Sequence, residues 1–324
     1  PIAVAYAAAV AVQALGEKPE SVEVNVSANI IKNVKSVVVP CTGGLRGIGA
    51  AVCAGIVAGC PEKELEILEE ITGEQKVEMK KMLDTMPMTI RESDKEYIFD
   101  IQIKACAGGH SGYVEIAGFH TNVICVKKDD EIIREKAYEE QGSSCATDRS
   151  LLTVEKIIEF ADCVDVADVE EVLQRQIDYN WAIAEEGMTG NWGAAIGKTL
   201  MEAYGNSVHN RAKAMAAAGS DARMNGCELP VVINSGSGNQ GMTTSLPVIV
   251  YAKELNVSKE MMLRALVVSN LITIHMKTGI GRLSAYCGAI SAGCGAGAGI
   301  CYLYGGRAYE ISHVIVNAVA INSG

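Results

Sequence analysis

The sequence predicts an α+β protein in which a mainly helical domain follows a smaller α/β module. Apolar and polar residues alternate in short segments of the range 20–149, as they do in half-buried strands. From residue 150 to residue 324 the apolar residues recur at helical spacing instead. Of the 324 residues, 49% are apolar and 21% are charged, which is a globular balance. We therefore expect two folded domains, an α/β module over 20–149 and a helical domain over 150–324.

An N-terminal helix over residues 1–16 precedes the α/β module. Pro1 suits a first helical turn, Ala dominates the segment, and Gly16 ends it. This helix could pack on either domain, and we expect it to pack on the helical domain. Inside the module the pattern predicts strands over 21–39, a small-residue helix over 48–58, a charged helical segment over 61–86, and further strands over 97–105, 113–116, 121–127 and 131–134.

The second domain is predicted to consist of helices. Its segments combine apolar stripes with polar faces, and the later ones are almost entirely apolar. We expect this domain to be the catalytic one, with the α/β module binding substrate or regulating it. The predicted helices are 151–160, 169–186, 192–204, 211–218, 260–275 and 284–303.

Charge and cysteine content exclude several classes of protein. The chain carries 28 basic and 39 acidic residues, so its net charge is −11, which argues against a nucleic-acid partner. Its eleven cysteines are an odd number without any CxxC pair, and the first residues do not resemble a signal peptide. We therefore expect reduced thiols and a cytoplasmic location.

The segment from Leu283 to Gly306 has no charged residue over 24 positions, which is long enough to span a bilayer. However, it is rich in Gly and Ala and poor in large apolar residues, and Arg282 and Arg307 flank it. We interpret it as a central helix of the helical domain and expect no membrane association.

The first candidate site is the segment Asn234–Thr244, which follows a short apolar run. Its glycines match GxGxxG literally, but no βαβ unit surrounds them and Pro247 follows closely, which disfavours a dinucleotide site. Small and hydroxylated residues at the start of a helix expose backbone N–H groups that suit a carboxylate or phosphate. A plain tight turn is the alternative. The expected substrate-binding residues here are Asn234, Ser235, Gly236, Ser237, Gly238, Asn239 and Thr243.

The second candidate is a row of cysteines, Cys287, Cys294 and Cys301, spaced seven residues apart on one helix face. Each step is about 10.5 Å along a helix axis, so one metal centre cannot take all three from an unbroken helix. For Cys294 and Cys301 we favour a packing role in a Gly/Ala core.

The third candidate is the polar break 275–282 between two apolar helices. Lys277 in this break is a candidate group for holding an anionic substrate near Cys287. An ordinary solvated loop is the alternative.

Four stretches together resemble the L-cysteine desulfidase family (UPF0597), which is related to the α chain of iron–sulfur L-serine dehydratase. They are PIAVAYAAA at 1–9, VSANIIKNVKSVVVPCTGG at 26–44, VVINSGSGNQGMTTSLPVIVYA at 231–252 and KTGIGRLSAYCGA at 277–289. The resemblance implies a lyase that depends on a [4Fe–4S] cluster and not on pyridoxal phosphate. Its reaction converts L-cysteine to pyruvate, ammonia and hydrogen sulfide.

The resemblance also implies roles for particular residues. Cys287 in SAYCGA matches the first cluster-binding cysteine of the family. The family's other two cluster cysteines are expected after Gly324, and its proposed base, a cysteine in a GCTEP motif, is expected before Pro1. Lys277 and the Asn234–Thr244 segment would then hold the substrate carboxylate while the base removes the α-proton.

Two alternatives stay open at the level of the sequence. An L-serine dehydratase would use the same chemistry with a hydroxyl leaving group. A non-catalytic amino-acid sensor would bind its ligand without a cluster. The sequence also leaves the oligomeric state open, including a homo-oligomer.

Overall fold

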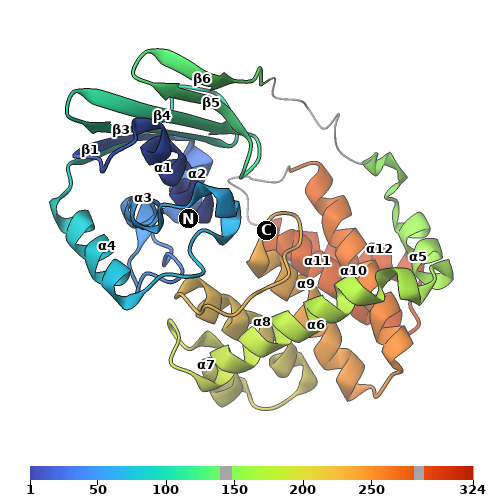
Figure 1. The fold of residues 1–324 in the computed structure, drawn as a ribbon. Helices are drawn as coiled ribbons and strands as arrows, with labels where there is room; N and C mark the ends of the chain where they lie inside the picture. The colour runs from blue at the N-terminus through green and yellow to red at the C-terminus, as the bar shows by residue number, and fades with distance from the viewer. Residues whose placement is uncertain (139–147, 281–287, 324) are drawn as a thin grey trace. The chain divides into compact units, whose positions relative to one another are not determined.

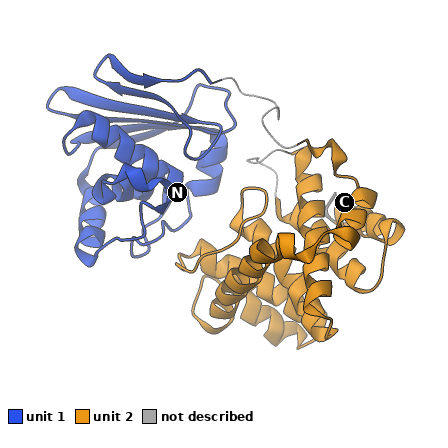
Figure 2. Cartoon of the chain, turned by 45° about the vertical axis from the view of Figure 1, so that its right-hand side comes forward, with its two compact units in different colours: residues 1–144 blue, residues 145–324 orange. Residues whose placement is uncertain are grey.

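The computed structural model describes residues 1–138, 148–280 and 288–323, and it divides the chain into two compact units (Figures 1 and 2). Unit 1 comprises residues 1–144 and unit 2 comprises residues 145–324. Unit 1 holds the sheet, whereas the described part of unit 2 contains helices and no strand. The prediction of a mainly helical α+β protein with a smaller α/β module is confirmed.

Unit 1 is built on a six-stranded sheet with the strand order β2-β1-β3-β4-β5-β6. Strand β1 pairs with β2 in parallel, and the other neighbours are antiparallel. The strands are β1 (Ser21–Val26), β2 (Met88–Glu92), β3 (Asp100–Ala107), β4 (His110–Ala117), β5 (Val123–Lys128) and β6 (Glu131–Glu135).

Helix α1 (Ile2–Leu15) belongs to unit 1, which corrects our expectation that it packs on the helical domain. Its alanines allow very close packing. A Cβ at Gly112 of β4 would lie 2.1 Å from the Ala11 carbonyl oxygen, and one at Gly55 would lie 1.9 Å from that of Ala5. Helix α1 therefore packs between the sheet and helix α3 (Gly47–Ala58), with most of its side chains buried.

Two further expectations for unit 1 are wrong in their bounds. The predicted strand region 21–39 ends as a strand at Val26, because Ser27 adopts the N-cap position of helix α2 (Ala28–Val34). The charged segment 61–86 divides into a short 3-10 helix, η1 (Pro61–Glu66), and helix α4 (Gly73–Thr85). Thr72 and Gln75 form a capping box that starts α4.

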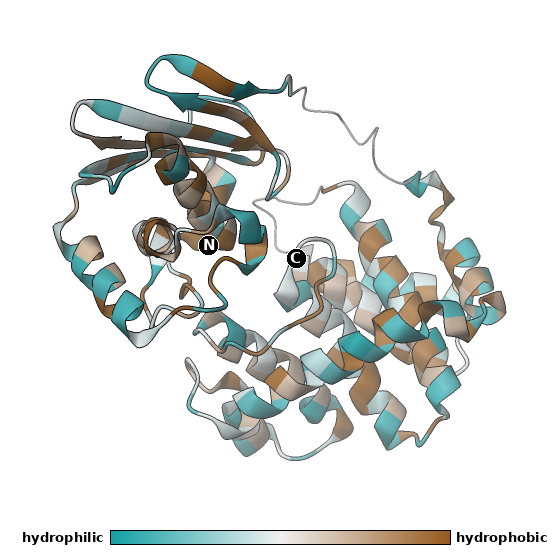
Figure 3. Cartoon of the chain, viewed as in Figure 1, coloured by the Kyte–Doolittle hydropathy of each residue, from teal (hydrophilic) through white to brown (hydrophobic). Residues whose placement is uncertain are grey.

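Unit 2 is a bundle of helices, several of which carry both hydrophilic and hydrophobic residues, as amphipathic helices do (Figure 3). Its elements are η2 (Arg149–Leu151), α5 (Val154–Cys163), α6 (Val166–Thr189), α7 (Ile196–Tyr204), α8 (Val208–Met224), α9 (Gly238–Glu254), α10 (Lys259–Thr278), α11 (Gly288–Leu303) and α12 (Ala308–Ser323). Helices α9 and α12 were not predicted from the sequence. In the parts of the chain that are described, no helix has the length and apolar character needed to cross a membrane.

The core of unit 2 forms where α9, α10 and α11 pack against one another. Large apolar side chains such as Leu263, Leu266 and Ile272 are fully buried there. Small residues set the distance between the helices. A Cβ at Gly295 of α11 would lie 2.4 Å from the carbonyl oxygen of Ser269 in α10, so the two backbones are nearly in contact.

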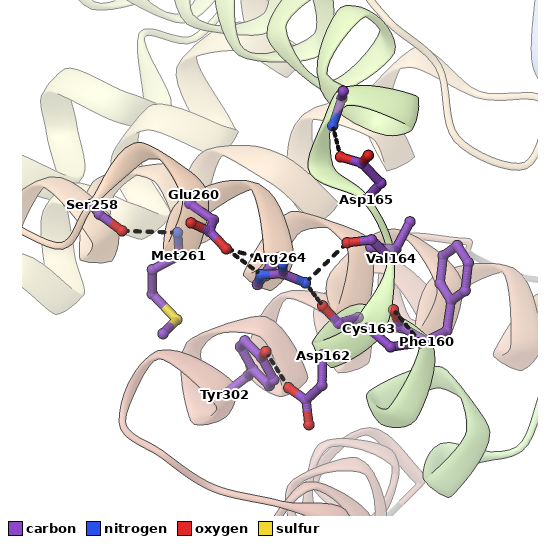
Figure 4. A network of polar contacts seen from close by, with 12 residues as sticks. Phe160, Asp162, Cys163, Val164, Asp165, Ser258, Glu260, Met261, Arg264 and Tyr302 are labelled. Carbon is purple, nitrogen blue, oxygen red and sulfur yellow. Dashed lines mark hydrogen bonds and ion pairs between the residues drawn. The ribbon is translucent and has the colours of Figure 1, made fainter.

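A polar network ties the C-terminal end of α5 to α10 and to α11 (Figure 4). Arg264 of α10 donates hydrogen bonds to the Ala161 and Val164 carbonyl oxygens at the end of α5, and it pairs with Glu260 one turn away. The hydroxyl of Tyr302 in α11 donates to Asp162 Oδ1 at 2.6 Å. The two Arg264 bonds to α5 satisfy carbonyls that a helix C-terminus leaves without partners.

Candidate functional site

The antiparallel pair of helices α9 and α10 positions the candidate site at one end of unit 2. The hydroxyls of Thr244 on α9 and Thr273 on α10 lie 3.0 Å apart. Residues four positions apart lie on the same face of a helix. One turn beyond this contact, Gln240 on α9 and Lys277 on α10 therefore lie on the facing sides of the two helices.

Helix α11 runs alongside α9 in the same direction. Gly299 packs against Val248, whereas Gly288, at the start of α11, packs against the side-chain amide of Gln240. The N-terminal ends of α9 and α11 therefore meet the C-terminal end of α10. We refer to this end, formed by residues 234–240, Lys277 and Gly288, as the cationic end.

A tight turn leads into α9. Asn234 and Ser237 exchange two backbone hydrogen bonds of 3.1 Å, and the central residues Ser235 and Gly236 have φ values of 48° and 83°. Two central residues with positive φ define a type I′ turn, which explains the preference for small residues. Ser237 then caps α9, since its side chain accepts from the Gln240 N–H.

Side-chain amides hold this turn in place. Asn234 Nδ2 donates to Asn270 Oδ1 on α10 at 2.9 Å, and Asn270 Nδ2 donates in turn to Gln176 Oε1 on α6 at 2.8 Å. Asn180 of α6 is fully buried and accepts from the Val232 backbone N–H at 2.9 Å. Because each amide is fixed by a partner on another helix, the turn has little freedom to move.

The electrostatic field at the cationic end is positive. Helix dipoles place about half a positive charge at the N-terminal ends of α9 and α11 and about half a negative charge at the C-terminal end of α10. The Lys277 ammonium adds a full charge on a side chain that is only 2% exposed. No Asp or Glu occurs in the sequence between residues 229 and 253 or between 261 and 309. The segments that build this end therefore suit an anion such as a carboxylate.

Arg223, at the end of α8, brings another positive charge to the start of α9. Its guanidinium lies against Gly238 and donates to Asn239 Oδ1 at 3.0 Å. Among the described residues it has no carboxylate partner. Burial lowers the pKa of this guanidinium, as expected for a charge removed from water without a counter-ion.

Most of the site residues predicted from the sequence lie at the cationic end, but not all of them do. Asn234 to Asn239 form the turn and the first residues of α9, and Lys277 lies at the same end on α10. Thr243 is half-buried one turn into α9, and its carbonyl lacks the usual helical partner because Pro247 has no N–H. Cys287 lies outside the described residues.

The described residues do not by themselves fit an iron–sulfur cluster. Within the ranges that the structure covers, no three His, Cys, Asp or Glu side chains gather closely enough to hold a metal. Burial raises the pKa of the Cys294 and Cys301 thiols, which disfavours the thiolate that metal binding needs. Cys294 is fully buried in the helix core, which agrees with a packing role.

Three residues that build or support this end were missed in the sequence. Gln240 stands inside the Asn234–Thr244 segment, and its position in the first turn of a capped helix was the available signal. Arg223 and Asn180 are distant in sequence, and only the packing of α8 and α6 on α9 brings them here. No pattern in the sequence indicated them.

Comparison with known proteins finds both a family and close relatives. The family model described as serine dehydratase alpha chain matches residues 62–324. A UPF0597 protein of Desulfitobacterium hafniense is 57% identical over 324 residues, which cover 100% of this chain and 75% of the relative. UPF0597 proteins of Lachnoclostridium phytofermentans and Treponema denticola are 49% and 42% identical, again over 100% of this chain and over 78% and 77% of their own length.

Proposed function

Because the chain belongs to the serine dehydratase alpha chain family and is similar over its whole length to UPF0597 proteins, we propose that it is an L-cysteine desulfidase. The reaction would be elimination of the β-sulfur from the amino acid, followed by hydrolysis of the enamine product. One L-cysteine and one water would give pyruvate, ammonia and hydrogen sulfide. The observation that carries this proposal is the cationic end, where a fixed polar turn and a buried lysine lie in a region without acidic residues.

The substrate carboxylate would bind at the start of α9. The N–H groups of the first turn of α9 have no carbonyl partner inside the helix. Those of Gly238 and Asn239 would hold the carboxylate, since the Ser237 side chain already accepts from the Gln240 N–H. The Lys277 ammonium would face the carboxylate from α10. Thr243, Ser235 and Asn239 would complete the polar wall around a small amino acid.

A [4Fe–4S] cluster belongs to the proposal through the family resemblance and through Cys287, which would be one of its ligands. A cluster with an open iron supplies a Lewis acid that activates a leaving group. The described residues would bind and orient the amino acid beside it.

The neighbouring function is L-serine dehydratase, which the description of the matching family favours. The two substrates differ only in the leaving atom, sulfur or oxygen. The ratio of kcat/KM for L-cysteine and L-serine separates them, and we expect the ratio to favour L-cysteine. A larger kcat/KM for L-serine would make the dehydratase the correct assignment.

The test uses the protein expressed from the whole gene and reconstituted anaerobically with iron and sulfide. We expect pyruvate and sulfide to form in equal amounts from L-cysteine. Lys277→Met should raise KM about tenfold to a hundredfold, because a charge-assisted hydrogen bond to the carboxylate is lost. Lys213→Met is the matched control, since Lys213 is exposed on α8.

Two results would contradict the proposal. A reconstituted protein that binds amino acids but turns over neither substrate would be a sensor and not a lyase. An unchanged KM in Lys277→Met would show that the carboxylate binds elsewhere.

A further inference from the structure

Gln240 carries a buried polar atom that the fold does not use. Its side chain is 7% exposed, and its Oε1 atom has no hydrogen-bond partner among the described residues. Buried side-chain oxygens in native proteins almost always accept a hydrogen bond, so such an exception points to a missing donor. The neighbouring amides Asn234, Asn270 and Gln176 all have partners.

The position of this amide is fixed from two sides. Gln240 lies in the first turn of α9, on the face that is turned toward Thr273 and Lys277 of α10. A Cβ at Gly288 would lie 2.3 Å from both Cδ and Nε2 of Gln240 and 2.6 Å from its Oε1. The amide group therefore fills the space at the start of α11, and it lies inside the cationic end.

The groups of this end that suit a carboxylate are donors. Backbone N–H groups at the start of α9 and the Lys277 ammonium can hold a carboxylate, but they offer nothing to a substrate ammonium. An α-amino acid carries three N–H donors next to its carboxylate. The unused Gln240 oxygen is an acceptor at the place where such donors would arrive.

We propose that Gln240 Oε1 accepts a hydrogen bond from the α-ammonium group of the substrate and thereby selects α-amino acids over the corresponding carboxylic acids. The inference rests on the proposed function, since it assumes an amino acid at the cationic end. A site with a buried acceptor rejects an analogue that lacks the donor, because the acceptor then stays unpaired and out of water.

The test measures binding of unreactive ligands by calorimetry to the reconstituted whole protein. L-Alanine carries both the ammonium and the carboxylate, whereas propionate lacks the ammonium and ethylamine lacks the carboxylate. We expect the wild-type protein to bind L-alanine at least about tenfold more tightly than propionate. Gln240→Met keeps the length of the side chain and removes the acceptor, so it should lose most of this preference while propionate affinity stays within about twofold.

Two further variants make the result specific. Gln240→Glu keeps an acceptor at the same place, so we expect it to retain or increase the preference for L-alanine over propionate. Gln102→Met makes the same chemical change at a buried glutamine of unit 1 and should leave the preference unchanged. If Gln240→Met does not fold, the Gln240→Glu result decides alone.

Several outcomes would overturn the inference. One is a wild-type protein that turns over L-cysteine but binds propionate and L-alanine with equal affinity. Another is a Gln240→Met variant that keeps the preference for L-alanine. A third is a Gln240→Glu variant that loses this preference. A Gln240→Met variant whose loss concerns the carboxylate, seen as equal weakening of L-alanine and propionate with ethylamine unchanged, would also overturn it. A wild-type protein that neither binds nor turns over amino acids would overturn the proposed function itself.

Discussion

The contact between α10 and α11 makes Gly295 a sensitive position of the helical core. A Cβ at this position would lie 2.1 Å from Thr273 Oγ1 and 2.4 Å from the Ser269 carbonyl oxygen. The threonine hydroxyl can rotate, but the carbonyl belongs to the backbone of α10. Gly295→Ala therefore forces α11 away from α10, and with it the start of α11 at the cationic end.

The magnitude follows from two opposing terms. Real Cβ atoms essentially never approach another atom closer than 3.0 Å, so the two backbones must separate by at least about 0.6 Å. Overpacking of this kind costs about 3 kcal/mol, at the upper end of the usual range, because backbone is involved. Replacing Gly by Ala inside a helix stabilises the folded state by about 1 kcal/mol through helix propensity. We expect a net loss of about 2 kcal/mol in the free energy of unfolding.

Gly293→Ala is the matched control. Gly293 lies in the same helix, two residues away, and a Cβ there would meet no described atom within 4 Å. This variant should gain up to about 1 kcal/mol from helix propensity alone. Urea unfolding followed by circular dichroism measures both variants, and we expect them to differ by about 3 kcal/mol with Gly295→Ala the less stable.

The same pair of variants tests the link between packing and function. Gly295→Ala should raise KM for L-cysteine, because it displaces the start of α11 from Gln240, whereas Gly293→Ala should not. Equal stability of the two alanine variants would refute the argument that the close approach of α10 and α11 is essential to the core.

Three further predictions concern buried polar groups. Asn180→Leu should cost about 3 kcal/mol in the free energy of unfolding and raise KM, because it leaves the Val232 N–H without its acceptor; urea unfolding and steady-state kinetics measure these effects. Burial raises the pKa of Asp100, so its ionisation opposes folding increasingly as the pH rises above the ordinary Asp range. The Asp100→Asn variant should therefore gain stability relative to wild type between pH 4 and pH 7, as measured by thermal unfolding. A difference in melting temperature that does not change with pH would contradict this. Tyr302→Phe should lose about 1 kcal/mol in urea unfolding through its hydrogen bond to Asp162, and an unchanged midpoint would show that the bond contributes nothing.

Most of the fold class was predictable because periodicity reports directly on which face of an element is buried. The alternating segments did become strands, and the amphipathic segments after residue 150 became helices. The location of helix α1 was not predictable in this way. An almost wholly apolar, Ala-rich helix has no polar face to show which surface it packs on, and only the close approach to Gly112 and Gly55 decides the matter.

Helix α9 was missed because its own residues argue against a helix. Gly, Asn and Thr make up most of its first two turns, and Pro247 stands in its interior. Tertiary burial overrides these preferences, since Met242, Leu246 and Ile249 are all fully buried. The helix central to the candidate site is thus one that local propensity supports poorly, as is common where function limits the choice of residues.

The candidate site was only partly predictable, because some of its residues form a sequence pattern and others come together only through tertiary packing. The Asn234–Ser237 turn and Lys277 stand out as polar breaks in apolar sequence, so a pattern can find them. Gln240 and Arg223 are candidates only because of the residues that pack around them in the folded chain. The Gln240 Oε1 atom is buried without a hydrogen-bond partner among the described residues. This property depends on tertiary packing, so no sequence pattern indicates it.

The glycines of α11 connect the composition of the chain with its proposed chemistry. Gly288, Gly295 and Gly299 are separated by seven and four residues, so they lie on one face, which packs against α9 and α10. Two parallel helices such as α9 and α11 place their positive ends together, which opposes their association. Close backbone packing along the rest of the helices offsets this repulsion, and the C-terminal end of α10 lies between the two positive ends. Larger residues on this face would push the helix starts apart and disperse the positive field that a substrate carboxylate needs, so the glycine content of this region serves the site as well as the core.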